Sequence, residues 1–412
     1  MRASLLGNNI ISVKEHNLQV VLLSLLYEEK LSRIELANLV HLSNTTITNL
    51  IAELQEEGLV TESDCSDHEE GSLRPVGRPR TAICLVPDAR FVIGVHVGVG
   101  TFRVALANLR DDIQNNKTVT FDVDAAPERV LEQIADCVNQ VIQESQVDPA
   151  LVLGVGVGLS GLVDYESGVN VMAPNLKWHD VPVKDFLTTK LSLPVVVDNN
   201  VRCMALGETY FGIGRDLESL VFVYGRIGVG AGFITKGEVF RGSNMGAGEI
   251  GHTTMLLDDG EICRCGKHGC LETLVSETAI IRQAEVLIRD YPEGILAKIV
   301  KDDPTLNLVD CVFEAAQRGD EAIREMLADK AYFLGVALAN MVNLYNPEMI
   351  LLGGLFAQDQ TYFIDPVIRT VRQMTFADLG ERLQIKAASF GWKAGVIGAA
   401  ALALTQFFYL KQ

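Results

Sequence analysis

The sequence predicts a mixed α/β protein made of two related lobes around a cleft, preceded by a small helical domain. Three observations carry this prediction. Residues 10–62 show helical periodicity. From Phe91 onward, strand-like and helix-like segments alternate. A hairpin around a glycine-rich turn occurs twice, in FVIGVHVGVGTFRVALANL and again in SLVFVYGRIGVGAGFITKGEVF. A chain of 412 residues is typical of two or three domains.

Composition and charge argue against several classes of protein. Hydrophobic residues make up 48% of the chain and charged residues 21%, which argues against wholesale disorder. The net charge of −18 argues against a surface that binds nucleic acid or anionic lipid throughout, but it leaves room for a small basic patch. No secretory pattern opens the chain, and the apolar run from Leu18 to Leu26 is about half a membrane span. We therefore expect a cytoplasmic protein without membrane insertion, whose eight cysteines are reduced thiols or metal ligands.

Three helices are expected in the N-terminal segment. Apolar residues at helical spacing predict the first helix from about residue 13 to 28. Ser32 and Glu35 form an S-x-x-E capping box, which predicts that the second helix begins at Ser32. Ser43 is the expected cap of the third helix and Gly58 its end. The buried face of that helix is predicted to contain Ile47, Leu50, Ile51 and Leu54. Spacing and polarity match a helix-turn-helix, although another small helical domain would show the same periodicity.

Two groups of residues are candidates for DNA contacts. The third helix carries short polar side chains off its apolar face, namely Asn44, Thr45, Thr48 and Asn49. The polar segment SDCSDHEEGSLRPVGRPRTAICLV lies between two extended segments, as the wing of a winged helix does, and it concentrates three arginines, Arg74, Arg78 and Arg80. An extended Gly-Arg-Pro-Arg tip suits a narrow minor groove. A solvated linker is the alternative, and the lack of Lys or Arg on the third helix counts against DNA binding because phosphate contacts dominate affinity.

The α/β part divides further. LVLGVGVGLSGLVD is a buried strand that ends in a tight glycine turn, after a helix near residues 126–145. LPVVVDNN is another strand that delivers polar residues at its end, followed by a helix over 201–211. The predicted domains are 1–87, 88–212 for the first lobe and 213–389 for the second lobe. A C-terminal helix near 390–410 is expected to pack back on the first lobe.

Three cysteines crowd into EICRCGKHGCLE, at positions 263, 265 and 270. Gly266 and Gly269 allow the turns that one small loop needs to wrap a tetrahedral ion. His252 is the expected fourth ligand. Three thiolates and one imidazole form a closed set, which predicts structural zinc rather than a metal that activates water. Three incidental thiols are the alternative.

The motifs GAGEIGHTT, CRCGKHGCLE and NPEMILLGG resemble those of the ROK family of bacterial sugar kinases and sugar-responsive repressors, over about residues 88–405. The helical and winged N-terminus resembles the repressor branch. The resemblance implies two actin-like, or ribonuclease-H-like, lobes, and a histidine, His252, that touches both zinc and the sugar. Matched motif by motif, the family's sugar contacts fall on Gly161, Asn199, Glu249, His252 and Glu272, with Asn175 and Asn200 as further candidates.

Three features of the family's kinases are lost in this sequence. His96 takes the place of the aspartate in the first phosphate loop, with Val99 and Gly100 at its second glycine and threonine. Arg226 and Ile227 replace the first glycine and threonine of the second phosphate loop. Asn200 falls where the kinases have their catalytic aspartate, and an amide cannot act as a base. Asp198, two residues earlier, could substitute only if the register slips. We therefore expect no catalytic residues.

The resulting hypothesis is a DNA-binding transcriptional regulator, a repressor of carbohydrate-utilisation genes, that binds operator DNA as a homodimer or homotetramer. A sugar or sugar derivative would be the effector and would change DNA affinity by closing the lobes. The alternative is a ROK sugar kinase with an N-terminal DNA- or protein-interaction module. A further alternative is that a protein partner, such as a transport component, relieves repression. The sequence does not specify the sugar, the operator or the sign of regulation.

Overall fold

A computed structural model describes residues 10–64, 81–258 and 260–410. Its N-terminal domain comprises α1 (Ile10–Tyr27), β1 (Leu31–Ser32), α2 (Arg33–Leu39), α3 (Asn44–Glu56), β2 (Val60–Asp64) and β3 (Thr81–Leu85). The three strands form one antiparallel sheet in the order β1-β3-β2. The domain is therefore helical with a small sheet, as expected, although α1 begins about three residues before the predicted start.

The predicted caps of the second and third helices are confirmed. Ser32 and Glu35 form the full capping box, in which the Ser32 hydroxyl accepts from Glu35 N and the Glu35 carboxylate accepts from Ser32 N. The Ser43 side chain accepts from Thr46 N at 3.0 Å. The predicted apolar face of α3 is also confirmed, because its four members are at most 4% exposed: Ile47, Leu50, Ile51 and Leu54.

The predicted wing lies mostly outside the described residues. β2 and β3 pair in antiparallel register, with Val60 opposite Leu85 and Asp64 opposite Thr81. The 16 residues that connect them, 65–80, are not among those described. Arg74, Arg78 and Arg80 therefore lie outside the part of the chain that the structure describes.

The first lobe is built on the five-stranded sheet β11-β7-β4-β5-β6. Its strands are β4 (Phe91–Val97), β5 (Thr101–Asn108), β6 (Ile113–Thr120), β7 (Val152–Leu159) and β11 (Val195–Asn199). A smaller sheet contains β8 (Leu162–Asp164), β9 (Val169–Ala173) and β10 (Trp178–Val181). The helices of this part of the chain are α4 (Pro127–Ser145), α5 (Val183–Leu191) and α6 (Asn200–Tyr210).

The second lobe is built on the five-stranded sheet β14-β13-β12-β15-β16. Its strands are β12 (Ser219–Gly225), β13 (Val229–Thr235), β14 (Glu238–Phe240), β15 (Met349–Gly354) and β16 (Gln384–Ala387). Its helices are α7 (Leu271–Val275), α8 (Glu277–Asp290), α9 (Ile295–Asp302), α10 (Leu308–Arg318), α11 (Glu321–Tyr345), α12 (Asp365–Met374) and α13 (Leu379–Arg382). The chain ends with α14 (Ala394–Leu404) and a short π-helix over Thr405–Tyr409.

The two sheets have the same topology. In each sheet, three consecutive strands pair antiparallel, and two later strands add in parallel beside the first of them. The repeated hairpin seen in the sequence is thus the start of each lobe. Two such sheets facing each other form the two-lobed, actin-like arrangement that was expected.

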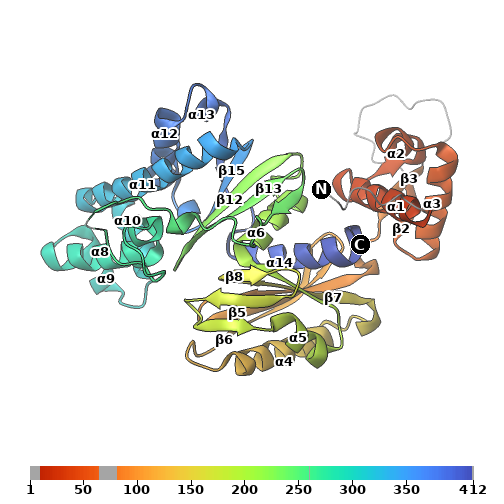
Figure 1. Cartoon of the computed structure of the whole chain (residues 1–412), viewed down its shortest axis with the longest axis horizontal. Helices are drawn as coiled ribbons and strands as arrows, with labels where there is room; N and C mark the ends of the chain where they lie inside the picture. Colours follow the sequence, from red (N-terminus) through yellow and green to blue (C-terminus); the bar gives the residue numbers. More distant parts are fainter. Residues whose placement is uncertain (1–9, 65–80, 259, 411–412) are drawn as a thin grey trace.

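A pair of helices, α6 and α14, fills the space between the sheets (Figure 1). Helix α14 packs on β4 and β7 of the first lobe, while α6 packs on β12 and β13 of the second. Glycine allows the close approach, since a Cβ on Gly156 of β7 would lie 2.0 Å from the Ala399 carbonyl oxygen of α14. A Cβ on Gly398 would lie 2.4 Å from the backbone of Cys203 in α6. The expected C-terminal helix therefore packs against the first lobe's sheet.

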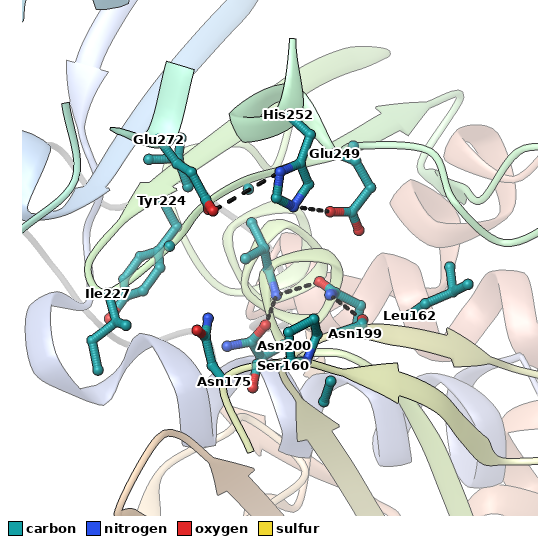
Figure 2. A pocket seen from close by; sticks show the side chains of 18 of the residues that line it. Ser160, Leu162, Asn175, Asn199, Asn200, Tyr224, Ile227, Glu249, His252 and Glu272 are labelled. Atoms are coloured by element: carbon teal, nitrogen blue, oxygen red, sulfur yellow. Dashed lines mark hydrogen bonds and ion pairs between the residues drawn. The ribbon is translucent and has the colours of Figure 1, made fainter. Parts of the chain in front are cut away.

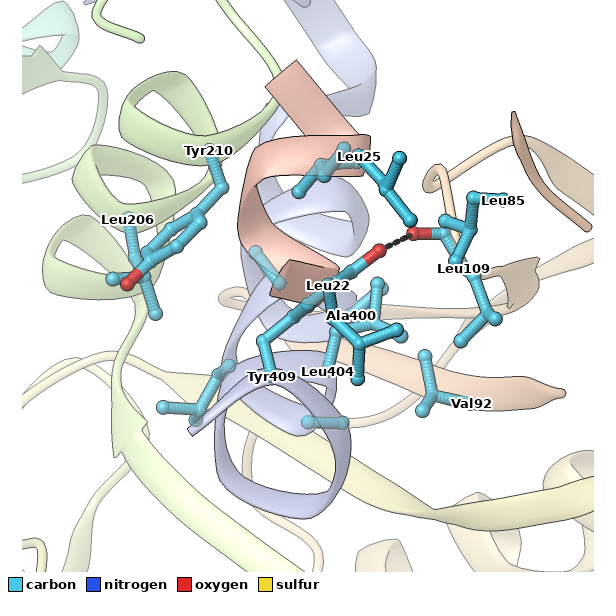
Figure 3. Close-up of a cluster of buried hydrophobic side chains, with 14 of the residues drawn as sticks. Leu22, Leu25, Leu85, Val92, Leu109, Leu206, Tyr210, Ala400, Leu404 and Tyr409 are labelled. Carbon is cyan, nitrogen blue, oxygen red and sulfur yellow. Dashed lines mark hydrogen bonds between the residues drawn. The ribbon is translucent and has the colours of Figure 1, made fainter. Parts of the chain in front are cut away.

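The N-terminal domain rests on the end of the chain and on α6 (Figure 1). Figure 3 shows Leu22 and Leu25 of α1 together with Tyr409 at the end of the chain. Leu206 and Tyr210 from α6 belong to the same apolar cluster. The Tyr409 hydroxyl donates to the Leu109 carbonyl oxygen at 2.6 Å, which attaches the C-terminal turn to the first lobe. Among the described residues, no helix is both long and apolar enough to cross a membrane.

Candidate functional site

A cavity of about 600 Å³ lies between the two lobes. All seven residues expected to contact a sugar line it: Gly161, Asn175, Asn199, Asn200, Glu249, His252 and Glu272. All of them except Gly161 are labelled in Figure 2. The first four come from the first lobe and its helix α6, and the other three come from the second lobe. The volume and the enclosure between lobes are typical of a small-molecule site.

The start of α6 brings two asparagines to the cavity. Asn199 is the N-cap, and its Oδ1 accepts from the backbone nitrogens of Val201 (2.8 Å) and Arg202 (3.2 Å). Its Nδ2 donates to the Gly161 carbonyl oxygen at 2.9 Å. Asn199 therefore has one amide N–H left for a ligand. The Oδ1 of Asn200 accepts from Val201 N at 3.0 Å, so its amide nitrogen is the group with more freedom to donate.

Asp198 is engaged elsewhere. Its side chain is 1% exposed and lies in a buried ion-pair network. Oδ1 accepts from Arg202 Nε at 2.8 Å, and Oδ2 accepts from Arg241 Nε at 2.9 Å. The Arg241 guanidinium also lies 3.8 Å from the centre of the Tyr165 ring. Both carboxylate oxygens of Asp198 are therefore occupied by arginines, and Asn200 rather than Asp198 lines the cavity.

Two carboxylates flank His252 in the cavity (Figure 2). The imidazole Nε2 lies 4.0 Å from a Glu249 oxygen, and Nδ1 lies 3.9 Å from a Glu272 oxygen. Burial raises the pKa of Glu249, an effect that the nearby His252 partly opposes. One face of the cavity therefore presents hydrogen-bond acceptors around a single imidazole.

The cysteine loop folds back on this histidine. The ligand atoms of His252, Cys263, Cys265 and Cys270 all lie within 4.8 Å of one another, so these four side chains can hold a metal ion. Cys263 Sγ is 3.5 Å from His252 Nδ1, and Cys265 Sγ is 3.7 Å from Cys270 Sγ. The loop's two glycines have positive φ, +83° at Gly266 and +67° at Gly269, as the predicted turns require. Soft thiolates with one imidazole are a donor set that suits zinc.

His252 has its two ring nitrogens in different environments. Nδ1 faces the cysteine loop, whereas Nε2 faces Glu249 and the cavity. Glu272 is drawn to the same loop, because the Cys263 thiol donates to its Oε1 at 3.0 Å. The metal cluster and the cavity thus share a wall.

Four of the residues predicted to replace phosphate-loop groups of the family's kinases also line the cavity, namely His96, Val99, Arg226 and Ile227. His96 is 6% exposed, and burial, reinforced by Arg103 and Arg226, lowers its pKa to about 4. Its imidazole is therefore neutral at physiological pH. Its ring packs against Gly395 of α14, where a Cβ would lie 2.4 Å from it. Arg226 and Ile227 lie in the tight turn between β12 and β13.

Sequence reasoning missed one cavity residue that makes a polar contact between lobes. Arg264 lies between two of the predicted metal ligands, lines the cavity, and donates from Nη1 to Asn175 Oδ1. The signal that could have found it is a charged residue inside the cysteine motif, where the loop holds its backbone in place.

The candidate DNA contacts on α3 are exposed, as the apolar pattern predicts. Asn44, Thr45, Thr48 and Asn49 all lie on the outer face of the helix. The Thr48 hydroxyl donates to the Asn44 carbonyl oxygen at 2.8 Å. Two basic residues of this domain are paired with acids, Lys14 with Glu53 and Arg33 with Glu62.

The fold and the site together define a two-lobed, actin-like protein with a cavity between its lobes and an additional N-terminal domain. The chain belongs to the ROK family, whose model matches residues 92–406. It is 29% identical to the xylose repressor of Caldicellulosiruptor bescii over 97% of this chain and 98% of that protein. It is 31% identical to a glucokinase of Halalkalibacterium halodurans, over 75% of this chain and 93% of the kinase.

A solved structure matches nearly the whole chain. The crystal structure of a ROK family transcriptional regulator, described as a homolog of the E. coli MLC protein, superposes with a TM-score of 0.82 at 26% identity. The match covers 97% of this chain and 98% of that one, so it includes the N-terminal helical domain.

Proposed function

We propose that the protein is a sugar-responsive transcriptional regulator, a repressor of carbohydrate-utilisation genes, that binds a sugar or sugar derivative in the cavity without phosphorylating it. One observation carries the proposal. Helix α6 presents Asn199 and Asn200 to the cavity at its first turn and packs Tyr210 against α1 of the helical domain at its last turn. A ligand that moves this helix moves the domain proposed to bind DNA.

The cavity is suited to a sugar. Vicinal hydroxyls each donate and accept, and the cavity offers amide donors in Asn175 and Asn199 beside carboxylate acceptors in Glu249 and Glu272. His252 Nε2 adds a group whose direction is held by the loop on the other side of the ring. The full-length similarity to a xylose repressor makes xylose the first sugar to test, with glucose and N-acetylglucosamine as comparisons.

Structural zinc is proposed for the four-residue cluster, with His252, Cys263, Cys265 and Cys270 as ligands. Bound there, zinc would cross-link the loop that carries Glu272 and would fix the tautomer of His252. The role is architectural, since four protein ligands leave no open position for a substrate.

Three observations support binding without phosphoryl transfer. Asn200 stands in the cavity where the family's kinases have an aspartate, and Asp198 is committed to Arg202 and Arg241. The imidazole of His96 is a poor substitute for an aspartate as a ligand of Mg²⁺, which prefers oxygen ligands. The kinase alternative has the glucokinase similarity in its favour, and sugar-stimulated ATP consumption would establish it.

DNA binding is assigned to α3 and to the segment that contains Arg74, Arg78 and Arg80. Groove contacts would come from the short polar side chains of α3, and phosphate or minor-groove contacts from the arginines. A homodimer or homotetramer on a symmetric operator is part of the proposal, as is a cytoplasmic location, where operator DNA lies. Relief of repression by a protein partner remains the further alternative.

The decisive experiment measures operator affinity with and without sugar. The purified protein selects its operator from random DNA, and fluorescence anisotropy follows binding in the presence of D-xylose, D-glucose or N-acetyl-D-glucosamine. We expect one sugar to change the Kd for the operator by at least about tenfold, which corresponds to about 1.4 kcal/mol of coupling. Tight DNA binding that none of a broad panel of sugars alters would contradict the assignment.

A further inference from the structure

The contact between Arg264 and Asn175 joins the two walls of the cavity. Asn175 belongs to the turn between β9 and β10 of the first lobe, whereas Arg264 belongs to the cysteine loop of the second. Both residues line the cavity. The bond therefore connects the lobes directly beside the space that a ligand would occupy.

The backbone of Arg264 is held in place by the loop. Its neighbours on both sides, Cys263 and Cys265, belong to the four-residue metal cluster. Cys263 N donates to the Lys267 carbonyl oxygen at 2.7 Å, and Gly266 N donates back to the Cys263 carbonyl oxygen at 2.9 Å. Because these bonds fix the backbone of Arg264, its side chain extends to Asn175 from a fixed starting point.

The guanidinium of Arg264 determines the orientation of the Asn175 side-chain amide. A guanidinium has only donors, so the amide oxygen must face Arg264 and the amide nitrogen must face away from it. The nitrogen is 3.6 Å from the point where a Cβ on Gly228 would lie, and Glu272 Oε2 is 3.2 Å from the same point. Gly228 lines the cavity and leaves this space open.

We infer that Arg264 is a positioning residue with two effects. It orients Asn175 as a hydrogen-bond donor to a ligand oxygen, and it connects the two lobes beside the ligand. A sugar hydroxyl beside Gly228 accepts from Asn175 Nδ2 and donates to Glu272 Oε2. The arrangement selects a hydroxyl at that position, because an ether oxygen or a hydrogen there leaves Glu272 without a donor. This inference rests on the proposed function, since it concerns recognition of the sugar.

Isothermal titration calorimetry of the full-length, zinc-loaded protein with D-xylose, D-glucose and N-acetyl-D-glucosamine tests the inference. Arg264→Ala is expected to weaken the sugar that binds the wild type by about tenfold, the effect of losing one charge-assisted hydrogen bond. Lys267→Ala is the matched control, because Lys267 lies in the same loop with an exposed side chain and does not line the cavity. Metal content, measured by mass spectrometry, is expected to be unchanged in both variants.

Asn175→Asp distinguishes the two roles of Asn175, which are to donate to the sugar and to accept from Arg264 across the lobes. The aspartate still accepts from Arg264 but has no N–H to offer the sugar, so we expect a loss of about tenfold or more in affinity. Unchanged or tighter binding by Asn175→Asp would show that Asn175 acts only as an acceptor for Arg264 and would overturn the inference. If Arg264→Ala loses its metal, this variant decides the question, because Asn175 lies in the other lobe.

The proposed function and the role of Arg264 fail under different outcomes. Absence of binding by the wild type to a broad sugar panel overturns the proposed function, and the inference falls with it. Wild-type sugar binding that a metal-loaded Arg264→Ala variant does not weaken, or that Asn175→Asp does not weaken, overturns the inference alone.

Discussion

Tyr27 of α1 and Tyr210 of α6 stack on each other, with ring centroids 6.5 Å apart and planes inclined by 18°. The contact joins the last turn of a helix in the N-terminal domain to the last turn of the helix whose first turn lies in the cavity. Helix α6 has 11 residues and therefore spans about 16 Å. A rigid helix of that length can transmit a shift at Asn199 to the helical domain without any other intermediary.

Tyr210→Leu should uncouple sugar binding from operator binding. The substitution keeps an apolar side chain at a buried position but removes the ring that stacks on Tyr27. We expect sugar affinity within about twofold of wild type, while the sugar-dependent change in operator Kd falls severalfold. Anisotropy titrations with and without sugar measure both quantities. Tyr291→Leu, at a tyrosine that is 59% exposed in the second lobe, is the control. A full sugar response in Tyr210→Leu would rule out this path.

Arginines of the predicted wing should contribute to operator affinity. Arg78→Ala combined with Arg80→Ala is expected to weaken operator binding. It should also reduce the slope of the logarithm of the operator-binding constant against the logarithm of the salt concentration, by about one for each phosphate that these arginines neutralise. Anisotropy at several salt concentrations gives the slope. Arg289→Ala, at an exposed arginine of α8, provides the comparison. Identical slopes for the double variant and wild type would refute the wing assignment.

Removal of zinc should impair sugar binding. Zinc would hold His252 directly and would anchor Cys270, two residues before Glu272, so a loop without this cross-link would hold two cavity side chains less firmly. Cys265→Ser, or treatment with a chelator, is expected to lower the melting temperature and to weaken sugar affinity by at least about tenfold. Re-addition of zinc to the chelated protein should restore both. If metal-free protein binds the sugar with wild-type affinity in calorimetry, the metal cluster does not support the cavity and this prediction is wrong.

Restoring one carboxylate should not restore a kinase. Asn200→Asp supplies the residue type expected for the family's kinases at this position, but His96 and Ile227 still stand where we expect the aspartate and threonine of the phosphate loops. We expect neither wild type nor Asn200→Asp to consume ATP when D-glucose or D-xylose is added, in a coupled assay that detects ADP. Sugar-stimulated turnover by the wild type would instead favour the kinase alternative.

The buried network around Asp198 should be important for stability. Asp198→Asn removes the charge that Arg202 and Arg241 share, and Arg202 is 3% exposed. Breaking a buried pair of this kind costs about 3–5 kcal/mol, so the melting temperature should fall by several degrees. Asp290→Asn, at an exposed aspartate, should leave it within about one degree. A melting temperature equal to wild type would contradict a stabilising role for this network.

Local sequence determined much of the structure. Helical periodicity and capping residues located α2 and α3 with their buried faces, because those signals act within a few residues of the chain. The repeated glycine hairpin indicated two lobes, and the cysteine spacing indicated a metal cluster. The residues matched to the family's sugar contacts all line one cavity. Short-range patterns were sufficient for the helices, the hairpins and the cysteine loop because these depend on neighbours in sequence, whereas the cavity residues were identified through the family resemblance.

Only the tertiary structure decided how those residues are used. Asn199 serves as the cap of α6 as well as lining the cavity, and Asp198 is bound by two arginines, of which Arg241 lies 43 residues away. The partner of Arg264 is 89 residues away in the other lobe. Such contacts leave no periodic signal, because they depend on how two separately formed sheets and the helices between them pack. The sequence by itself named the chemistry of the site, and the packing of α6 between the lobes decided which groups remain free to act.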